Sequence, residues 1–102
     1  EIATEKVVAL CDRARNEPRD LYDIWFLMNG KHVDLSIMTA AIADKLAFRG
    51  RTLDGISNEL REKEERLRRL WSARLSHQVS LLPGFREVFR AVQREFRRAG
   101  LP

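Results

Sequence analysis

Apolar residues recur every three to four positions along almost the whole chain, which is the spacing of helices with one buried face. β-branched residues are scattered, and no segment alternates in the manner of a strand. The pattern predicts five helices, at about residues 2–15, 18–29, 35–48, 57–77 and 84–98. We therefore expect an all-α fold, a bundle of four to five helices in a single domain covering residues 1–102.

The second predicted helix differs from the others because it is apolar nearly all round. Its centre runs from Leu21 to Met28 and contains one charged residue, Asp23. A helix of this kind is expected to be buried on most sides, so helix 18–29 is predicted to form the centre of the bundle. Pro18 suits its first turn, and Gly30 is predicted to supply a left-handed C-terminal cap. Any exposed part of this helix could drive formation of a homodimer.

Boundary signals support the remaining helices. Asp34 is predicted to cap the third helix and Gly50 to end it. Ser57 or Asn58 is predicted to cap the long fourth helix, and Pro83 precedes the last one. The fourth helix carries many Glu and Arg residues four apart, predicted as weak surface pairs: Glu62–Arg66, Glu64–Arg68 and Glu65–Arg69. The phenylalanines of the last helix fall at core spacing, so we interpret them as packing residues.

Charge is distributed unevenly between the two halves of the chain. Residues 1–50 hold 7 Lys or Arg against 8 Asp or Glu, whereas residues 51–102 hold 12 against 7, and 11 of those 12 are arginine. The basic half 51–102 therefore indicates an anionic partner, with RNA as the candidate. No apolar run is long enough for a bilayer, so no membrane association is expected. Cys11 is the only cysteine, which favours a buried structural thiol and a reducing cytoplasm.

Three charged residues lie unusually close to apolar faces. Lys6 is one turn from both Ile2 and Leu10, and Asp20 and Asp23 share one face of the most apolar helix. Charges next to a core need partners. A purely structural interpretation is available, since Arg19 and Asp23 are four residues apart and acidic residues favour the first turn of a helix.

Two short motifs, in order and at a fixed spacing, resemble the "EKxxAL … RDxxDL" pair of the AbiE-type (AbiEii/AbiGii) abortive-infection toxins. These are bacterial and archaeal members of the polymerase-β-like nucleotidyltransferase superfamily. The close resemblance covers about residues 1–30, and Ile24 replaces the final leucine. The matching residues are Glu5, Lys6, Ala9, Leu10, Arg13, Arg19, Asp20 and Asp23.

In that family an N-terminal α/β half carries a Gly-Ser turn and an Asp-x-Asp pair that hold Mg²⁺ on the nucleotide phosphates. The resemblance implies that Lys6 binds the triphosphate, that Asp23 or Asp20 is catalytic, and that Glu5 and Arg19 support them. Of the two aspartates we prefer Asp23. This sequence contains neither the Gly-Ser turn nor an Asp-x-Asp pair, so no metal site is expected in it.

The chain starts at Glu1 without a methionine and directly in helix-forming sequence. We therefore expect it to be the C-terminal helical part of a longer nucleotidyltransferase, inactive alone, with Mg²⁺ and NTP as cofactors of the full-length parent and none for these residues by themselves. The parent would transfer a nucleotide to an acceptor such as RNA and would have a cognate antitoxin. The alternatives are a basic helical module that binds nucleic acid or protein without catalysis, and a purely structural bundle.

Overall fold

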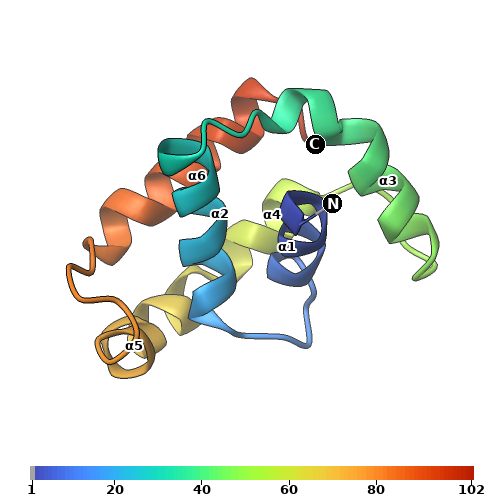
Figure 1. Ribbon diagram of the computed structural model, residues 1–102. Coiled ribbons are helices and arrows are strands. Elements are labelled where there is room, and N and C mark those ends of the chain that lie inside the picture. Colours follow the sequence, from blue (N-terminus) through green and yellow to red (C-terminus); the bar gives the residue numbers. More distant parts are fainter. Residues whose placement is uncertain (1) are drawn as a thin grey trace.

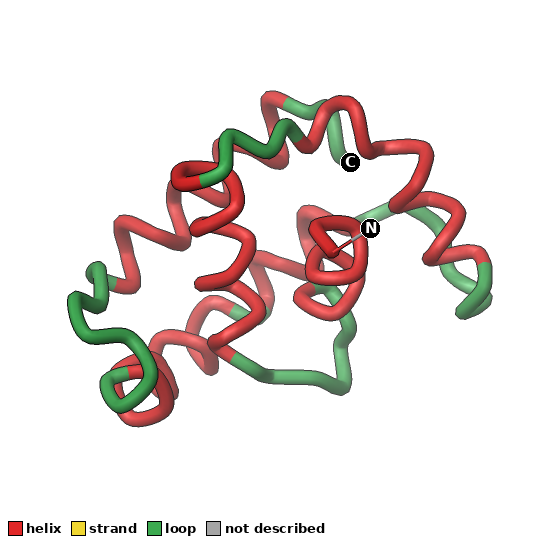
Figure 2. The backbone as a smooth tube through the Cα atoms, viewed as in Figure 1, coloured by secondary structure: helices red, strands yellow, loops and turns green. Residues whose placement is uncertain are grey.

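The computed structural model describes residues 2–102, and all regular structure in this range is helical, with no strand (Figure 1, Figure 2). The predicted all-α fold is confirmed. Six α-helices and one short 3-10 helix follow one another along these residues: α1 (Ile2–Leu10), α2 (Pro18–Gly30), η1 (Leu35–Met38), α3 (Thr39–Ala47), α4 (Ile56–Glu62), α5 (Glu64–Leu75) and α6 (Phe85–Arg98).

Helix α2 lies at the centre of the bundle, as predicted, because it packs against α1, α5 and α6. Helix α3 packs on the other side of α1, so α3 and α5 lie at opposite ends of the molecule (Figure 1). Most of the apolar centre of α2 is buried or partly buried, as predicted, but one face is open. Leu21 and Ile24 are fully buried, but Trp25 is only partly covered and Phe26 is 42% exposed. Three neighbouring helices leave one face of α2 open.

The core is built from the apolar stripe of each helix. Helix α6 contributes Val88, Phe89, Val92 and Phe96, all fully buried. Phe85 is partly buried and packs against the rings of Trp71 and Phe89, with centroid separations of 5.5 and 5.2 Å. The aromatic residues of the last helix are therefore packing residues, as the sequence pattern indicates.

Three of the predicted helices differ in the structure. The first ends at Leu10 rather than near residue 15, and residues 11–17 form a loop in which the Asp12 side chain accepts a hydrogen bond from the Ala14 amide at 3.0 Å. The predicted fourth helix is broken at Lys63 into α4 and α5. The third begins as the 3-10 turn η1 before it continues as α3.

The predicted helix ends are partly correct. Asp34 caps η1 by accepting a hydrogen bond from the Ser36 amide at 3.0 Å, and Gly50 follows α3 with a φ of 68°. The prediction for Gly30 is wrong, because Gly30 is the last residue of α2 and the left-handed conformation falls on His32, with a φ of 55°.

The predicted cap of α4 is also wrong. Gly55, with a φ of 76°, occupies the N-cap position, so the helix begins one residue before Ser57. Ser57 instead binds the end of the chain. Its amide donates to the Pro102 carbonyl at 2.7 Å, and its hydroxyl donates to the Leu101 carbonyl at 3.0 Å. Leu101 is buried, so the last residues close over the start of α4.

The surface of α5 is charged but loosely paired. Within the described residues, none of the three pairs predicted four residues apart forms an ion pair; Arg68 pairs with Glu65, one turn earlier. Such exposed pairs contribute little to stability. Across residues 2–102 no helix is long and apolar enough to span a bilayer.

Candidate functional site

Lys6 and Asp23, one from each of the two sequence motifs, meet where α1 packs against α2. The Lys6 ammonium lies 2.9 Å from Asp23 Oδ2. About a third of the Lys6 side chain is exposed, and 19% of the Asp23 side chain. The ion pair is therefore at the surface of the bundle. An ammonium has three hydrogen-bond donors, so Lys6 keeps donors for a further partner.

Asp20 lies one helical turn before Asp23 and is almost fully buried. Arg15, from the loop between α1 and α2, donates to both of its oxygens, from Nε at 2.6 Å and from Nη2 at 3.2 Å. The Lys6 ammonium is 4.0 Å from Asp20 Oδ1. The sequence analysis did not identify Arg15. A buried carboxylate requires a partner, and of the two arginines in the 11–17 loop Arg15 is the closer in sequence to Asp20.

Arg19 completes the group. Its Nε donates to Asp23 Oδ1 at 2.8 Å, which confirms the predicted pairing four residues apart, and its Nη1 donates to Gln78 Oε1 at 2.7 Å. We call Lys6, Arg15, Arg19, Asp20 and Asp23 the junction cluster. It holds three cations and two carboxylates, a net charge of +1. Its exposed part is therefore favourable for an anion.

Glu5 lies outside the junction cluster. It neighbours Lys6 in sequence, but it is exposed, and its carboxylate pairs with Lys45 of α3 at 3.1 Å. This partner holds the pKa of Glu5 below its ordinary value. The structure thus brings together four of the five residues that the motifs indicate: Lys6, Arg19, Asp20 and Asp23.

Lys63 is a further residue that sequence reasoning missed. It lies at the break between α4 and α5, is buried, and donates from its ammonium to the Leu10 carbonyl at 2.5 Å and to the Arg15 carbonyl. Desolvation lowers its pKa. The sequence does contain a signal for it. Counted from Leu60, Lys63 is three residues later and Leu67 is seven residues later. Lys63 therefore falls within the apolar stripe of the predicted helix.

The position of Lys63 affects the junction cluster directly. Leu10 is the last residue of α1, and its carbonyl belongs to the negative end of the helix dipole. Arg15 supplies the guanidinium that binds Asp20. Lys63 therefore fixes the backbone at both ends of the segment 10–15, which connects Lys6 to the partner of Asp20.

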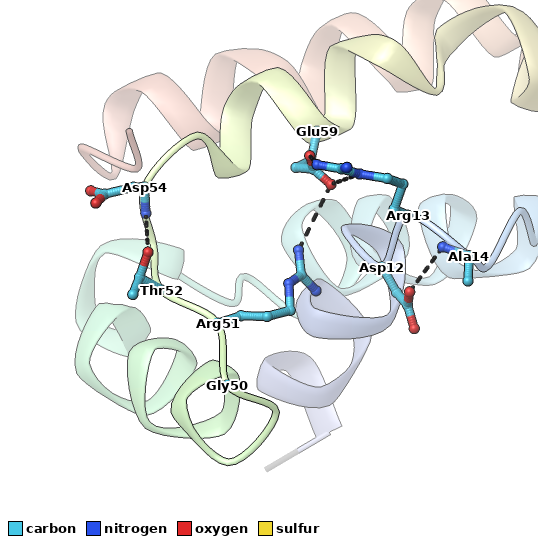
Figure 3. Close-up of a pocket in the computed structure, with 8 residues that line it drawn as sticks. All are labelled: Asp12, Arg13, Ala14, Gly50, Arg51, Thr52, Asp54 and Glu59. Carbon is cyan, nitrogen blue, oxygen red and sulfur yellow. Dashed lines mark hydrogen bonds and ion pairs between the residues drawn. The ribbon is translucent and has the colours of Figure 1, made fainter.

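A hollow of about 460 Å³ lies on the other side of the 11–17 loop, and Figure 3 shows the residues around it. Arg13 and Arg51 converge there on Glu59 of α4. Arg13 donates to Glu59 at 2.6 Å, Arg51 lies 3.9 Å from it, and the Arg13 hydrogen bond lowers the pKa of Glu59. Arg51 also donates to the Cys11 carbonyl at 2.9 Å. Arg13, Arg51 and Glu59 are paired with one another, so we interpret their role in this hollow as structural.

Cys11 is fully buried, as expected for a structural thiol. Burial raises its pKa to about 12. A thiol of this kind is not a nucleophile at neutral pH, because only the thiolate reacts.

The junction cluster does not fit a metal ion. Among residues 2–102 no three carboxylate, histidine or cysteine side chains converge in a way that could hold a metal. The two carboxylates that do come close, Asp20 and Asp23, are each already bound by an arginine and face Lys6. Mg²⁺ would have to displace these cations to bind Asp20 or Asp23.

The fold and the cluster together define an all-α domain with a partly exposed cationic site between its first two helices. A model of the family described as the nucleotidyl transferase AbiEii toxin of a type IV toxin–antitoxin system matches residues 1–94, and the chain belongs to that family. Searches of curated proteins and of solved structures gave no match. The family match confirms the resemblance inferred from the two motifs.

Proposed function

We propose that this chain forms the helical half of a nucleotidyltransferase site, in which Lys6 binds the triphosphate of an NTP. The observation that carries the proposal is the 2.9 Å contact between Lys6 and Asp23, because it unites the two motifs of the family at one partly exposed position. A lysine ammonium is a compact charge suited to phosphate oxygens. In the full-length parent the reaction is transfer of a nucleotide from an NTP to an acceptor such as RNA.

The other cluster residues have distinct roles in this proposal. Asp23 is the catalytic candidate that we prefer, since it orients Lys6 and is partly accessible to a ligand. Asp20 is buried against Arg15, so it supports the site electrostatically from behind. Arg19 holds Asp23 from the opposite side and adds a second positive charge next to the phosphate position.

Mg²⁺ and the nucleotide that it accompanies are proposed for the full-length parent. The ion would neutralise charge on the phosphates, held by the Gly-Ser and Asp-x-Asp half that this sequence does not contain. The residues of this chain would bind the triphosphate and fix its orientation next to that half.

The test is Mg²⁺-dependent labelling of an acceptor by radioactive NTP, using the full-length parent. Lys6→Ala and Asp23→Ala should each reduce labelling at least about a hundredfold, in line with loss of a positioned transition-state contact. Lys45→Ala is the matched control, because it removes an ammonium that pairs with a carboxylate outside the cluster. Unchanged labelling by the Lys6 or Asp23 variant would contradict the proposed roles.

We propose RNA as the acceptor, bound through the arginine face of α6. Arg86, Arg90 and Arg94 follow one another at four-residue intervals, are exposed, and form no ion pair within residues 2–102. Replacing these three residues by glutamine should weaken RNA binding and reduce its dependence on salt concentration, since each phosphate contact contributes to the salt slope. Arg68→Gln, whose guanidinium already pairs with Glu65, is the control. An unaltered salt slope in the triple variant would exclude this face.

A cognate antitoxin is the proposed partner, because the family is described as part of a type IV toxin–antitoxin system. Expression of the full-length parent should stop cell growth, and co-expression of the antitoxin should restore it. Lys6→Ala should remove the growth defect without the antitoxin. Toxicity that persists in the Lys6→Ala variant would separate the toxin activity from this site.

A further inference from the structure

A shallow groove of about 320 Å³ lies directly next to the junction cluster. One wall is the open face of α2, and the other is the segment that follows α5. The groove shares Arg19 and Asp23 with the cluster, so the two form one continuous surface. Its lining residues are Arg19, Tyr22, Asp23, Phe26, Gln78, Val79 and Ser80.

The α2 wall of the groove is aromatic. The rings of Tyr22 and Phe26 are nearly parallel, at 24°, with centroids 6.2 Å apart. The Arg19 guanidinium lies 5.9 Å from the centre of the Tyr22 ring. Phe26 is 42% exposed, which is a high value for a phenylalanine on the central helix of a bundle. The aromatic surface is therefore available to a flat ligand.

The spacing along α2 relates this surface to the phosphate position. Asp23, which holds Lys6, and Phe26 are three residues apart and lie on the same side of the helix. Three residues span about 4.5 Å along a helix axis. A ribose separates the phosphates of a nucleotide from its base, so a nucleotide with its phosphates at Lys6 can extend its base along α2 towards Phe26.

We infer that the groove binds the nucleobase of the NTP, with the base stacked on Phe26 and Tyr22. This inference rests on the proposed function, since it adds a base site to the triphosphate site at Lys6. Aromatic side chains stack on any base, so stacking supplies affinity without selecting one. Gln78 and Ser80 on the opposite wall carry the polar groups that can reach the edge of the base.

The test is binding of three kinds of probe to the 102-residue chain, measured by NMR titration, which detects millimolar affinities. The probes are each of the four NTPs, each of the four nucleosides, and inorganic tripolyphosphate. Phe26→Ala should weaken NTP binding about tenfold and leave tripolyphosphate binding unchanged. Phe26→Tyr should restore NTP affinity, because it keeps an aromatic ring. Phe48→Ala is the matched control, since Phe48 is 91% exposed and lies outside the groove.

The outcomes separate the two proposals. If NTPs and tripolyphosphate bind equally well, and Phe26→Ala affects neither, the base site is overturned while the phosphate site stands. If tripolyphosphate does not bind, the phosphate site is overturned. Binding of the nucleosides alone then tests the base site. Nucleosides that shift no signal of Tyr22, Phe26 or Gln78 would overturn it. Because Phe26 is partly exposed, the alanine variant should keep its fold, which circular dichroism checks.

Discussion

The α1–α2 junction and the outer face of α6 are both rich in charge, but they hold it in opposite ways. At the junction, Asp20 is buried and Lys6 is two-thirds covered, and each charge has a partner within 4.0 Å. On α6, Arg90 and Arg94 extend into solvent without an ion pair in the described part of the chain. Burial imposes a fixed geometry on charges, because an unpaired buried ion is costly. Exposed arginines stay hydrated, and their side chains keep their conformational freedom.

This difference underlies our proposal that Lys6 and Asp23, rather than the arginines of α6, belong to the reaction site. A reactive group must be held in one orientation, and the junction holds Lys6 and Asp23 in this way through contacts with Arg15, Arg19 and Asp20. The face of α6 suits a less specific task, attraction of a polyanion. Composition alone favours the arginine-rich half as the functional region, whereas burial points to the junction.

The largest effect is expected at Lys63. Lys63→Ala removes the donor to the carbonyls of Leu10 and Arg15 in a buried place, so the free energy of unfolding should fall by about 3 kcal/mol. Urea denaturation followed by circular dichroism measures the change. Lys31→Ala, at an exposed lysine, is the control and should have almost no effect.

Lys63→Met distinguishes the two contributions of this side chain. Methionine keeps most of the apolar stem but has no donor. If Lys63→Met is as stable as the wild type, the hydrogen bonds do not stabilise the fold, and the junction differs less from the surface than we propose.

A smaller effect is expected for the two aspartates, and it should differ between them. Asp20→Ala should reduce the free energy of unfolding by about 2 kcal/mol, because it leaves Arg15 and part of Lys6 without their buried partner. Asp23→Ala should cost about 1 kcal/mol, since Asp23 is partly exposed and water can replace it. Thermal denaturation of both variants gives the comparison. Equal losses would mean that burial does not separate the two carboxylates.

A weaker effect should appear at acid pH for an exposed ion pair. Asp34 accepts hydrogen bonds from Ser36 and Arg98, which lower its pKa to about 2. Because the folded pKa lies below the ordinary value of 3.8, the stabilisation is present above pH 3.8 and is lost as the pH falls towards 2. Asp34→Asn should therefore lower the melting temperature near pH 5 by a small amount and have a clearly smaller effect near pH 2. A difference that is as large at pH 2 as at pH 5 would contradict this origin.

The smallest effect on stability is expected on α6 itself. Arg90→Ala should change the free energy of unfolding by less than about 0.5 kcal/mol, because the side chain is exposed and unpaired within residues 2–102. The same urea experiment measures it. A larger loss would show that Arg90 packs against the helix surface and that the arginine face has a structural role.

The sequence predicts the helices and their buried faces well, because helical periodicity is a local property. It predicts less about where a helix stops. The break at Lys63 and the end of α1 at Leu10 depend on contacts between residues 48 to 53 positions apart, which no local pattern contains. Glycine is the residue type most common at a left-handed helix cap, yet after α2 the left-handed residue is His32 and not Gly30.

The candidate site shows the same division. The motifs indicate Lys6, Asp20 and Asp23 directly, and their meeting follows from the packing of α1 on α2. Their supporting residues are less visible. Arg15 lies in a loop, and Lys63 comes from another helix. Glu5 illustrates the opposite error, since adjacency to Lys6 in sequence does not give adjacency in space when both lie on a helix.

The contact between Lys63 and the segment 10–15 links the site to the order of synthesis. Both motifs are synthesised before Lys63, the residue that fixes their connection, which follows 48 positions after Arg15. At 5 to 20 residues per second, roughly, several seconds separate the two events. During that interval the junction lacks the hydrogen bonds from Lys63. Helix α2 also lacks α5 and α6, which pack against it in the finished bundle. The junction therefore reaches its final form only after α5 and α6 have been synthesised.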